Sequence, residues 1–375
     1  MMSEWNHSTI NDVCVLVTDG SHSSPKSVHD GEYMVSVKDF TDYGFDFSSC
    51  RMISHDDYEV LKRNGCVPQI DDILIGKDGA RFFEDIIIYR QREKPALLSS
   101  IAILRCDKSK ILPDFLYYAL RTPSFKQDVK DNYGSGSAIP RIILKDFKRM
   151  MVSYPSLEKQ RSVISVLTAI DSKIQANTEI NDNLQQQAQA IYSSMFIDNP
   201  DPAWSHGHLS DLITVKYGKD HKKLADGIYP VYGSGGIMRY VERPLYNKES
   251  VLIPRKGTLN NVMYVNQPFW SVDTMFYTEM KLPNVAKFVY HFVKAKDLAS
   301  MNAGSAVPSM TTDILNAMEV VIPSASALEE FESLVAPMYE AMEANDVQSK
   351  ALSQMRDTLL PKLMSGKSDV SSVQL

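Results

Sequence analysis

Two segments of the sequence, 168 positions apart, carry the same short motif and the same apolar pattern. Gly136–Pro140 reads GSAIP and Gly304–Pro308 reads GSAVP. At the same offset the pair Pro155-Ser156 matches Pro323-Ser324, and the apolar positions coincide for about 60 residues without a gap. A five-residue motif can recur by chance, but a shared apolar phase over this length indicates a duplicated unit.

The duplication extends upstream in a looser form. Residues 4–13, 74–79 and 115–120 resemble 203–212, 253–257 and 288–293 in turn, and the first copy is about 31 residues longer. Both copies contain short β-type runs interrupted by Gly, Asn and Pro, together with short helical patterns. We therefore expect an α+β protein with two related but divergent mixed units.

After each motif the sequence changes to a heptad pattern. Apolar or small residues recur in steps of three and four, which is typical of a helix with a narrow apolar seam. The first seam runs for about 40 residues without Gly or Pro, or roughly 60 Å of helix. Pro337 is expected to kink the second helix or delay its start. The seam residues are Leu167, Ile170, Ile174, Asn177, Leu184 and Ile191, and then Val335, Met338, Met342, Asn345, Leu352 and Leu359.

A long helix with a narrow apolar seam needs a partner, and the other heptad segment is the nearest one. We therefore expect two long helices packed as an antiparallel coiled coil, with a pseudo-two-fold internal repeat. Asn177 and Asn345 fall in the seam, where a polar residue specifies register at some cost in stability.

Composition limits where nucleic acid can bind and where the chain resides. The chain has 375 residues, is 44% hydrophobic and carries a formal net charge of −6. The acidic excess lies in 156–200 and 324–375, so any DNA contact must use local basic loops elsewhere. No apolar run is long enough to span a membrane. The N-terminal residues lack a signal-peptide pattern, and the four cysteines form no C-x-x-C pair, so a cytoplasmic protein with free thiols is expected.

Motifs for catalysis are weak. Residues 198–202 read DNPDP, which lacks the paired prolines and the aromatic residue of an adenine methyltransferase loop and is typical of a turn. Residues 365–368 read SGKS without the upstream Gly or the preceding strand of a phosphate-binding loop. The eight His residues show no metal-ligand spacing, so no metal site is expected.

Basic and Gly/Ser-rich loops are the candidate DNA contacts. Arg suits a guanine edge, Asn suits an adenine edge, and backbone amides in Gly-rich loops suit phosphate. Any one of these residues is equally compatible with an ordinary solvated loop. Tyr117 and Tyr118 are expected in the core rather than stacked on bases. The candidates are Lys77, Arg81, Ser135, Ser137 and Arg141 in the first copy, and Lys219, Lys222, Lys223, Ser234, Arg255, Lys256, Asn260, Asn261 and Ser305 in the second.

Over essentially its whole length the chain resembles the specificity subunit of type I restriction–modification enzymes. The strings at 154–184, 229–237, 251–265, 268–276 and 304–309 carry the resemblance. It implies two target-recognition domains, each reading one half of a bipartite, asymmetric site in double-stranded DNA. The two antiparallel helices would separate them, set the spacer and dock methyltransferase subunits. The expected segments are 1–155 (first recognition domain), 156–200 (central helix), 201–323 (second recognition domain), 324–365 (second helix) and 366–375 (flexible tail).

The resemblance also implies that the chain is not an enzyme and holds no cofactor. S-adenosylmethionine, ATP and Mg would belong to partner subunits. These would be two methyltransferase subunits together with restriction or translocase subunits. Two alternatives remain at this stage. One is a single-chain DNA methyltransferase or nuclease, and the other is a coiled-coil interaction scaffold unrelated to DNA. Methylation by the chain alone, or only after a methyltransferase subunit is added, distinguishes them.

Overall fold

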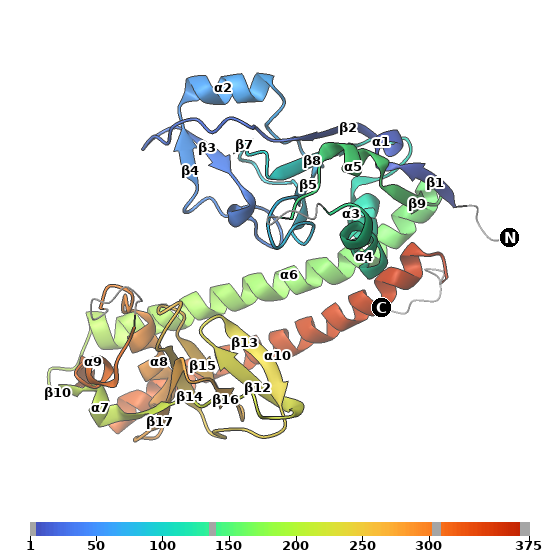
Figure 1. Cartoon of the computed structure of the whole chain (residues 1–375). Helices are drawn as coiled ribbons and strands as arrows, with labels where there is room; N and C mark the ends of the chain where they lie inside the picture. The colour runs from blue at the N-terminus through green and yellow to red at the C-terminus, as the bar shows by residue number, and fades with distance from the viewer. Residues whose placement is uncertain (1–4, 135–139, 302–308, 368–375) are drawn as a thin grey trace. The chain divides into compact units, whose positions relative to one another are not determined.

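In the computed structural model the chain forms two units, and each unit contains part of both long helices (Figure 1). Unit 1 consists of Met1–Gln175 and Gln348–Leu375, and unit 2 of Ala176–Val347. Each long helix is therefore shared between the units, and the segment boundaries expected from the sequence stay a prediction. The structure describes residues 5–134, 140–301 and 309–367.

Unit 1 contains three small sheets. A four-stranded antiparallel sheet has the order β2-β8-β5-β6, a three-stranded sheet has the order β4-β3-β7, and β1 pairs with β9. The strands are β1 (Asn6–Thr9), β2 (Cys14–Asp19), β3 (Glu32–Val35), β4 (Arg51–Ile53), β5 (Ile73–Gly76), β6 (Ile86–Ile88), β7 (Ala96–Leu97), β8 (Ile101–Cys106) and β9 (Met151–Tyr154). The short helices are α1 (Ile10–Val13), the 3₁₀ turn Val37–Asp39, α2 (His55–Arg63), α3 (Pro113–Arg121), α4 (Pro123–Asn132) and α5 (Leu144–Arg149).

Unit 2 repeats this topology strand for strand. Its sheets have the orders β11-β17-β14-β15, β13-β12-β16 and β10-β18. In both units the middle strand of the three-stranded sheet pairs antiparallel on one side and parallel on the other. The elements are β10 (Ser205–His208), α7 (Leu209–Leu212), β11 (Ile213–Tyr217), β12 (Asp226–Gly233), β13 (Gly236–Val241), β14 (Ser250–Pro254), β15 (Met263–Val265), β16 (Trp270–Ser271), β17 (Met275–Met280), α8 (Ala286–Lys294), α9 (Thr312–Asn316) and β18 (Glu319–Ile322).

Two helices account for much of the extra length of the first copy. α2 follows β4, and α4 follows α3, and neither has a counterpart in the described part of unit 2. Both begin at side-chain caps: Ser54 accepts from the backbone N–H of Asp57, and Thr122 accepts from that of Phe125. Such caps satisfy backbone donors that a helix start leaves unpaired. The additions therefore extend the repeated topology without changing its strand order.

The two long helices begin and end close to the heptad segments. α6 spans Leu157–Ser193 and continues as a π-helical turn over Ser194–Asp198, and α10 spans Ala325–Met364. The expectation that Pro337 delays the second helix is wrong, because α10 starts twelve residues earlier and runs through that position. Pro337 is exposed, so its ring lies on the outer face of the helix and disturbs no core packing.

The helices pack antiparallel, as predicted. In unit 1 the core contains Val163 and Leu167 of α6 together with Leu360 and Leu363 of α10. In unit 2 the core pairs the C-terminal part of α6, including Tyr192, with the N-terminal part of α10. Residues early in α6 thus pack against residues late in α10, and residues late in α6 pack against residues early in α10.

A polar layer interrupts the apolar seam at the expected asparagines. Asn177 is fully buried, and its amide lies 3.3 Å from the carbonyl oxygen of Asn345. The Asn345 amide donates in turn to Asn181 Oδ1 at 2.8 Å. Asn177 and Asn345 are equivalent in the repeat, so equivalent residues meet each other across the helices. All twelve seam residues are buried or half-buried.

A large-to-small change on the seam tests this packing. Leu167→Ala removes a fully buried side chain from the unit 1 core and should lower the free energy of unfolding by about 2–5 kcal/mol. Ile180→Ala on the same helix removes a side chain that is 45% exposed and should change it by less than about 0.5 kcal/mol. Urea denaturation of both variants measures the difference, and equal costs would contradict the assigned seam.

Candidate nucleic-acid interface

In unit 2 the basic loop after β14 lies against the turn between β12 and β13. The N–H groups of Arg255 and Lys256 both donate to the carbonyl oxygen of Thr274, at 2.9 and 3.2 Å. Gly257 has φ +85°, and a Cβ added there would lie 2.5 Å from Ser234 Oγ. A left-handed backbone and this close approach both favour glycine. The fold therefore brings Ser234 and the Arg255–Lys256 pair together.

The side chain of Arg255 is oriented by its neighbours. Its guanidinium carbon lies 5.4 Å from the centre of the Tyr217 ring, and Nη1 lies 3.3 Å from the carbonyl oxygen of Asp273. A guanidinium over an aromatic face gains about 0.5–1 kcal/mol at an exposed site. Tyr217 is 52% exposed and Lys256 is exposed, so this cation–π pair stays accessible to a ligand. Charge and an exposed ring together suit contact with DNA.

The loop that begins at Tyr217 has a fixed backbone and free cationic ends. A Cβ added at Gly218 would lie 2.0 Å from the carbonyl oxygen of Val272. The next residue, Lys219, donates its N–H to Ser271 at 2.8 Å and accepts at its carbonyl from the Trp270 indole at 2.8 Å. The side chains of Lys219, Lys222 and Lys223 are all exposed. This loop therefore presents three lysines from a rigid base.

The two predicted adenine-reading amides have partners within the protein. Asn260 donates to Asp297 Oδ1 at 2.9 Å and accepts from the N–H of Ala299 at 2.9 Å. The bond from Asn260 lowers the pKa of Asp297. Asn261 donates to the carbonyl oxygen of Ser234 at 2.8 Å. In this structure both amides hold the loops in place, a role that their sequence pattern did not indicate.

In unit 1 the equivalent of Arg255 is turned inward. Lys77 follows β5 as Arg255 follows β14, but its side chain is only 8% exposed. Its ammonium lies 3.4 Å from Asp19 and 3.6 Å from Asp78. The sequence analysis named Lys77 as a candidate DNA contact, and the structure shows it buried beside two carboxylates that compensate its charge.

Other cationic side chains of unit 1 lie near the loop that follows β5. Arg81 is exposed and bonded to Asp85 at 2.6 Å, and that bond raises the pKa of Arg81. Arg141 is exposed as well. Lys38, which the sequence analysis missed, lines a cavity of about 580 Å³ with Arg81 and Phe40. In the sequence, the position of Lys38 three residues after the end of β3 is the feature that indicates a basic residue at a strand end. The candidates Ser135, Ser137 and Ser305 lie outside the described residues.

The repeated motif leads into the same backbone pairing in both units. Ile142 donates its N–H to the carbonyl of Lys77 at 3.0 Å, and Met310 donates to that of Arg255 at 2.9 Å. These donors are 168 positions apart, as are the two copies of the motif. The segment that follows GSAxP is thus bonded to the basic loop in each copy.

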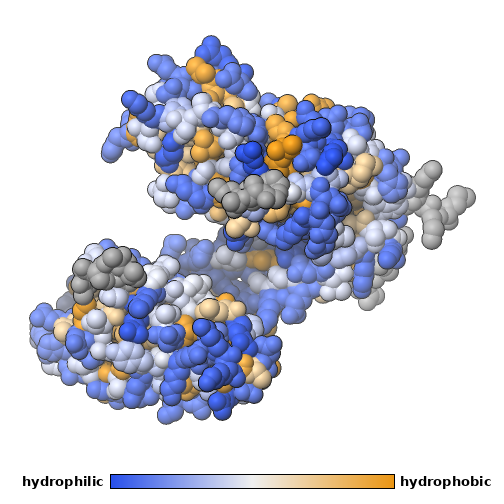
Figure 2. All heavy atoms as spheres, in the orientation of Figure 1, coloured by the Kyte–Doolittle hydropathy of each residue, from blue (hydrophilic) through white to orange (hydrophobic). Residues whose placement is uncertain are grey.

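Metal-ligand clusters and membrane-spanning helices are two further features to consider in the described part of the chain. No group of three or more His, Cys, Asp or Glu side chains suited to a metal ion occurs within 5–134, 140–301 and 309–367. No helix among those residues is long and apolar enough to cross a membrane. The face drawn in Figure 2 is largely hydrophilic, with separate hydrophobic patches.

The comparisons with known proteins agree with this architecture. The family model described as "Type I restriction modification DNA specificity domain" matches residues 2–186 and 203–331. Two matched regions cover most of the chain, and one lies in each copy. The chain therefore belongs to this family, and DNA sequence recognition in a type I restriction–modification system is its function.

Individual relatives support the same assignment, and a solved structure shares the fold. The MjaIX specificity subunit of Methanocaldococcus jannaschii is 24% identical over 304 residues, which cover 69% of this chain and 70% of the relative. The HindI specificity subunit of Haemophilus influenzae is 20% identical, covering 68% and 78%. The S subunit structure from M. genitalium covers 96% of both chains with a TM-score of 0.59 and 17% identity, which shows a shared fold.

Gly218 offers a test of the rigid loop. Gly218→Ala places a methyl group against a backbone oxygen and should cost about 2 kcal/mol of stability while weakening DNA binding. At Gly235 an added Cβ meets no atom within 4 Å, so Gly235→Ala is the matched control and should change neither property. Thermal unfolding and fluorescence anisotropy with duplex DNA measure both effects. Equal behaviour of the two variants would contradict a constrained loop.

Proposed function

We propose that the two units read two unlike halves of one bipartite DNA site. The observation that carries this proposal is that the two units share a strand topology but have different side chains at equivalent positions. At the ends of β11 and β14, unit 2 has the accessible pair Tyr217–Arg255. At the ends of the equivalent strands β2 and β5, unit 1 has the Asp19–Lys77 ion pair. A cation–π pair and a buried ion pair present different groups to a base edge. Two such readers on one chain recognise an asymmetric site.

The helical pair, in this proposal, sets the spacer and docks the catalytic partners. The net negative charge of the chain lies in the helical segments, and the candidate base-contacting residues lie in the loops of the two mixed units. Paired methyltransferase subunits would bring S-adenosylmethionine and methylate adenine at N6, and restriction or translocase subunits would use ATP and Mg for cleavage. This chain itself would supply recognition and geometry without a catalytic step. Family membership supports these roles.

Arg255 is the side chain with which we test direct reading. If its guanidinium contacts a guanine edge, Arg255→Ala should cost about 1–3 kcal/mol and relax preference at one position of one half-site. Arg255→Lys keeps the charge but loses the planar fork, so it should restore non-specific binding and not the base preference. Binding to a library of half-site variants measures both. If Arg255→Lys behaves as the wild type, Arg255 contacts phosphate only.

A domain exchange tests the two-reader model. Residues 201–308 are replaced with the matching segment of a family relative, and the chain is expressed with its methyltransferase subunits. Sequencing of methylated DNA should then show a change in one half of the site and none in the other. A change in both halves would contradict independent reading. The chain without methyltransferase subunits is the control: methylation by it alone would favour the single-chain enzyme instead.

A further inference from the structure

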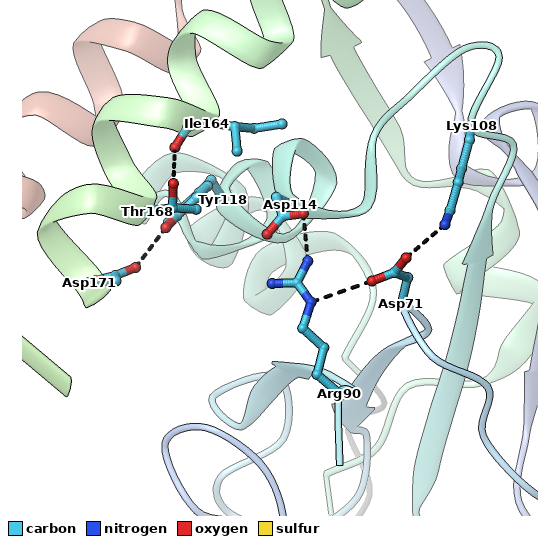
Figure 3. Close-up of polar contacts among 8 residues, drawn as sticks. All are labelled: Asp71, Arg90, Lys108, Asp114, Tyr118, Ile164, Thr168 and Asp171. Carbon is cyan, nitrogen blue, oxygen red and sulfur yellow. Dashed lines mark hydrogen bonds and ion pairs between the residues drawn. The ribbon is translucent and has the colours of Figure 1, made fainter. Parts of the chain in front are cut away.

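One side chain of α3 is hydrogen-bonded into the helical pair of unit 1. Tyr118 is 2% exposed, and its O–H donates to Asp171 Oδ2 of α6 at 2.8 Å (Figure 3). Arg356 of α10 donates to the other oxygen, Asp171 Oδ1, at 3.0 Å. A single carboxylate therefore joins three helices. Although burial alone would lower the pKa of Arg356, its bonds to Asp171 and Asp357 raise it, so the guanidinium stays charged.

Unit 2 joins the corresponding three helices with neutral groups. His291 of α8 is fully buried, and burial lowers its pKa to about 4. The neutral ring therefore has one donor and one acceptor. His291 Nδ1 lies 2.8 Å from Gln189 Oε1 of α6, and the O–H of Tyr339 on α10 lies 2.9 Å from Nε2. Donation from Nδ1 and acceptance at Nε2 satisfy both contacts.

The two arrangements occupy equivalent places in the repeat. Tyr118 and His291 fall at the same position of the matched segments 115–120 and 288–293, and Asp171 and Tyr339 are 168 positions apart. Gln189 aligns with Asp357, the neighbour of Arg356. Leaving a buried polar group unpaired costs about 1–3 kcal/mol. Each set of hydrogen bonds therefore fixes the orientation of α3 or of α8 against α6 and α10.

The same short helices are also bonded to the sheets that carry the candidate DNA-contacting loops. In unit 1, Arg90 Nη2 donates to Asp114 of α3 at 2.7 Å, and Arg90 lies two residues after the end of β6 (Figure 3). In unit 2, the position equivalent to Asp114 is Lys287 of α8, whose ammonium lies 3.2 Å from Glu249. Glu249 directly precedes β14, which ends next to Arg255. A shift of α3 or α8 would thus move the reading loops.

We propose that Tyr118 and His291, with their partners on α6 and α10, are positioning residues that set the gap between the two half-sites. They do so by holding each reading surface at one angle on the helical pair. This inference rests on the proposed function, because a gap exists only if two half-sites are read. The residues touch no DNA and act through α3 and α8.

Removal of single hydroxyl groups tests the proposal. Tyr118→Phe and Tyr339→Phe each delete one bond to Asp171 or His291 and keep the aromatic ring. Tyr117→Phe and Tyr290→Phe are matched controls on α3 and α8: the hydroxyl of Tyr117 contacts Arg121 of its own helix, and within the described residues no hydrogen bond joins Tyr290 to α6 or α10. Each chain is assembled with its methyltransferase subunits and given DNA in which the gap varies by up to two base pairs.

The expected result is a loss of discrimination between gaps. Tyr118→Phe and Tyr339→Phe should raise methylation at neighbouring gaps, relative to the native gap, by about three- to tenfold. The half-site bases should stay the same, and both controls should keep the wild-type ratio. Variants that lose thermal stability but keep the wild-type gap ratio would overturn the proposal, since their hydroxyl groups would then stabilise the fold without positioning it.

Hydrogen exchange of the free chain separates this inference from the proposed function. Tyr118→Phe should speed exchange of the α3 amides by a similar factor, and Tyr117→Phe should not. Unchanged exchange in Tyr118→Phe overturns the role of Tyr118 whatever the complex does. If the wild-type complex methylates no two-part site, the proposed function and the gap-setting role both fail, and faster exchange in Tyr118→Phe would then establish only that this bond holds α3.

Discussion

The packing of α6 against α10 is the interaction on which both units depend. Each unit buries the apolar face of its short helices against a surface made from both long helices: Val163 and Leu360 in unit 1, and Tyr192 and Phe331 in unit 2. The chain segments involved lie more than 130 residues apart. Neither core is complete until these segments meet, so burial in each unit is coupled to the formation of the helical pair.

The two units combine a constant backbone with variable side chains. Gly20 and Gly218 both lie so close to a carbonyl oxygen that a Cβ would come within 2.3 and 2.0 Å of it. Both donate their N–H at 3.0 Å to the first residue of β8 or β17. The residues immediately before these glycines are Asp19 and Tyr217. One is a carboxylate and the other is an aromatic phenol. A frame of this kind allows the groups at a reading surface to change while their positions stay fixed.

Local patterns predicted much of the fold, and contacts between distant residues account for most of what they missed. The heptad steps and the absence of Gly and Pro located α6, and the shared phase predicted its antiparallel partner. The burial of Lys77 was not predictable, because Asp19 lies 58 positions earlier and only the pairing of β2, β8 and β5 brings them together. Tyr118 was expected in the core, yet its bond to Asp171 depends on how α3 crosses α6. Asn260 likewise reads as a surface amide until the position of Asp297 is known.

The opposite charges of Asp114 and Lys287 have a consequence for how the chain folds. These residues occupy equivalent positions, and Lys287 lies 2.6 Å from Glu332 of α10. If α3 docked on the helix surface that belongs to α8, the Asp114 carboxylate would face Glu332 and the two like charges would repel. If α8 docked in the place of α3, the buried ammonium of Lys287 would face Ile164 of α6. Ile164 is the residue equivalent to Glu332, and it carries no charge that could compensate the ammonium. The charges of Asp114 and Lys287 therefore favour docking of α3 and of α8 each on its own helix surface.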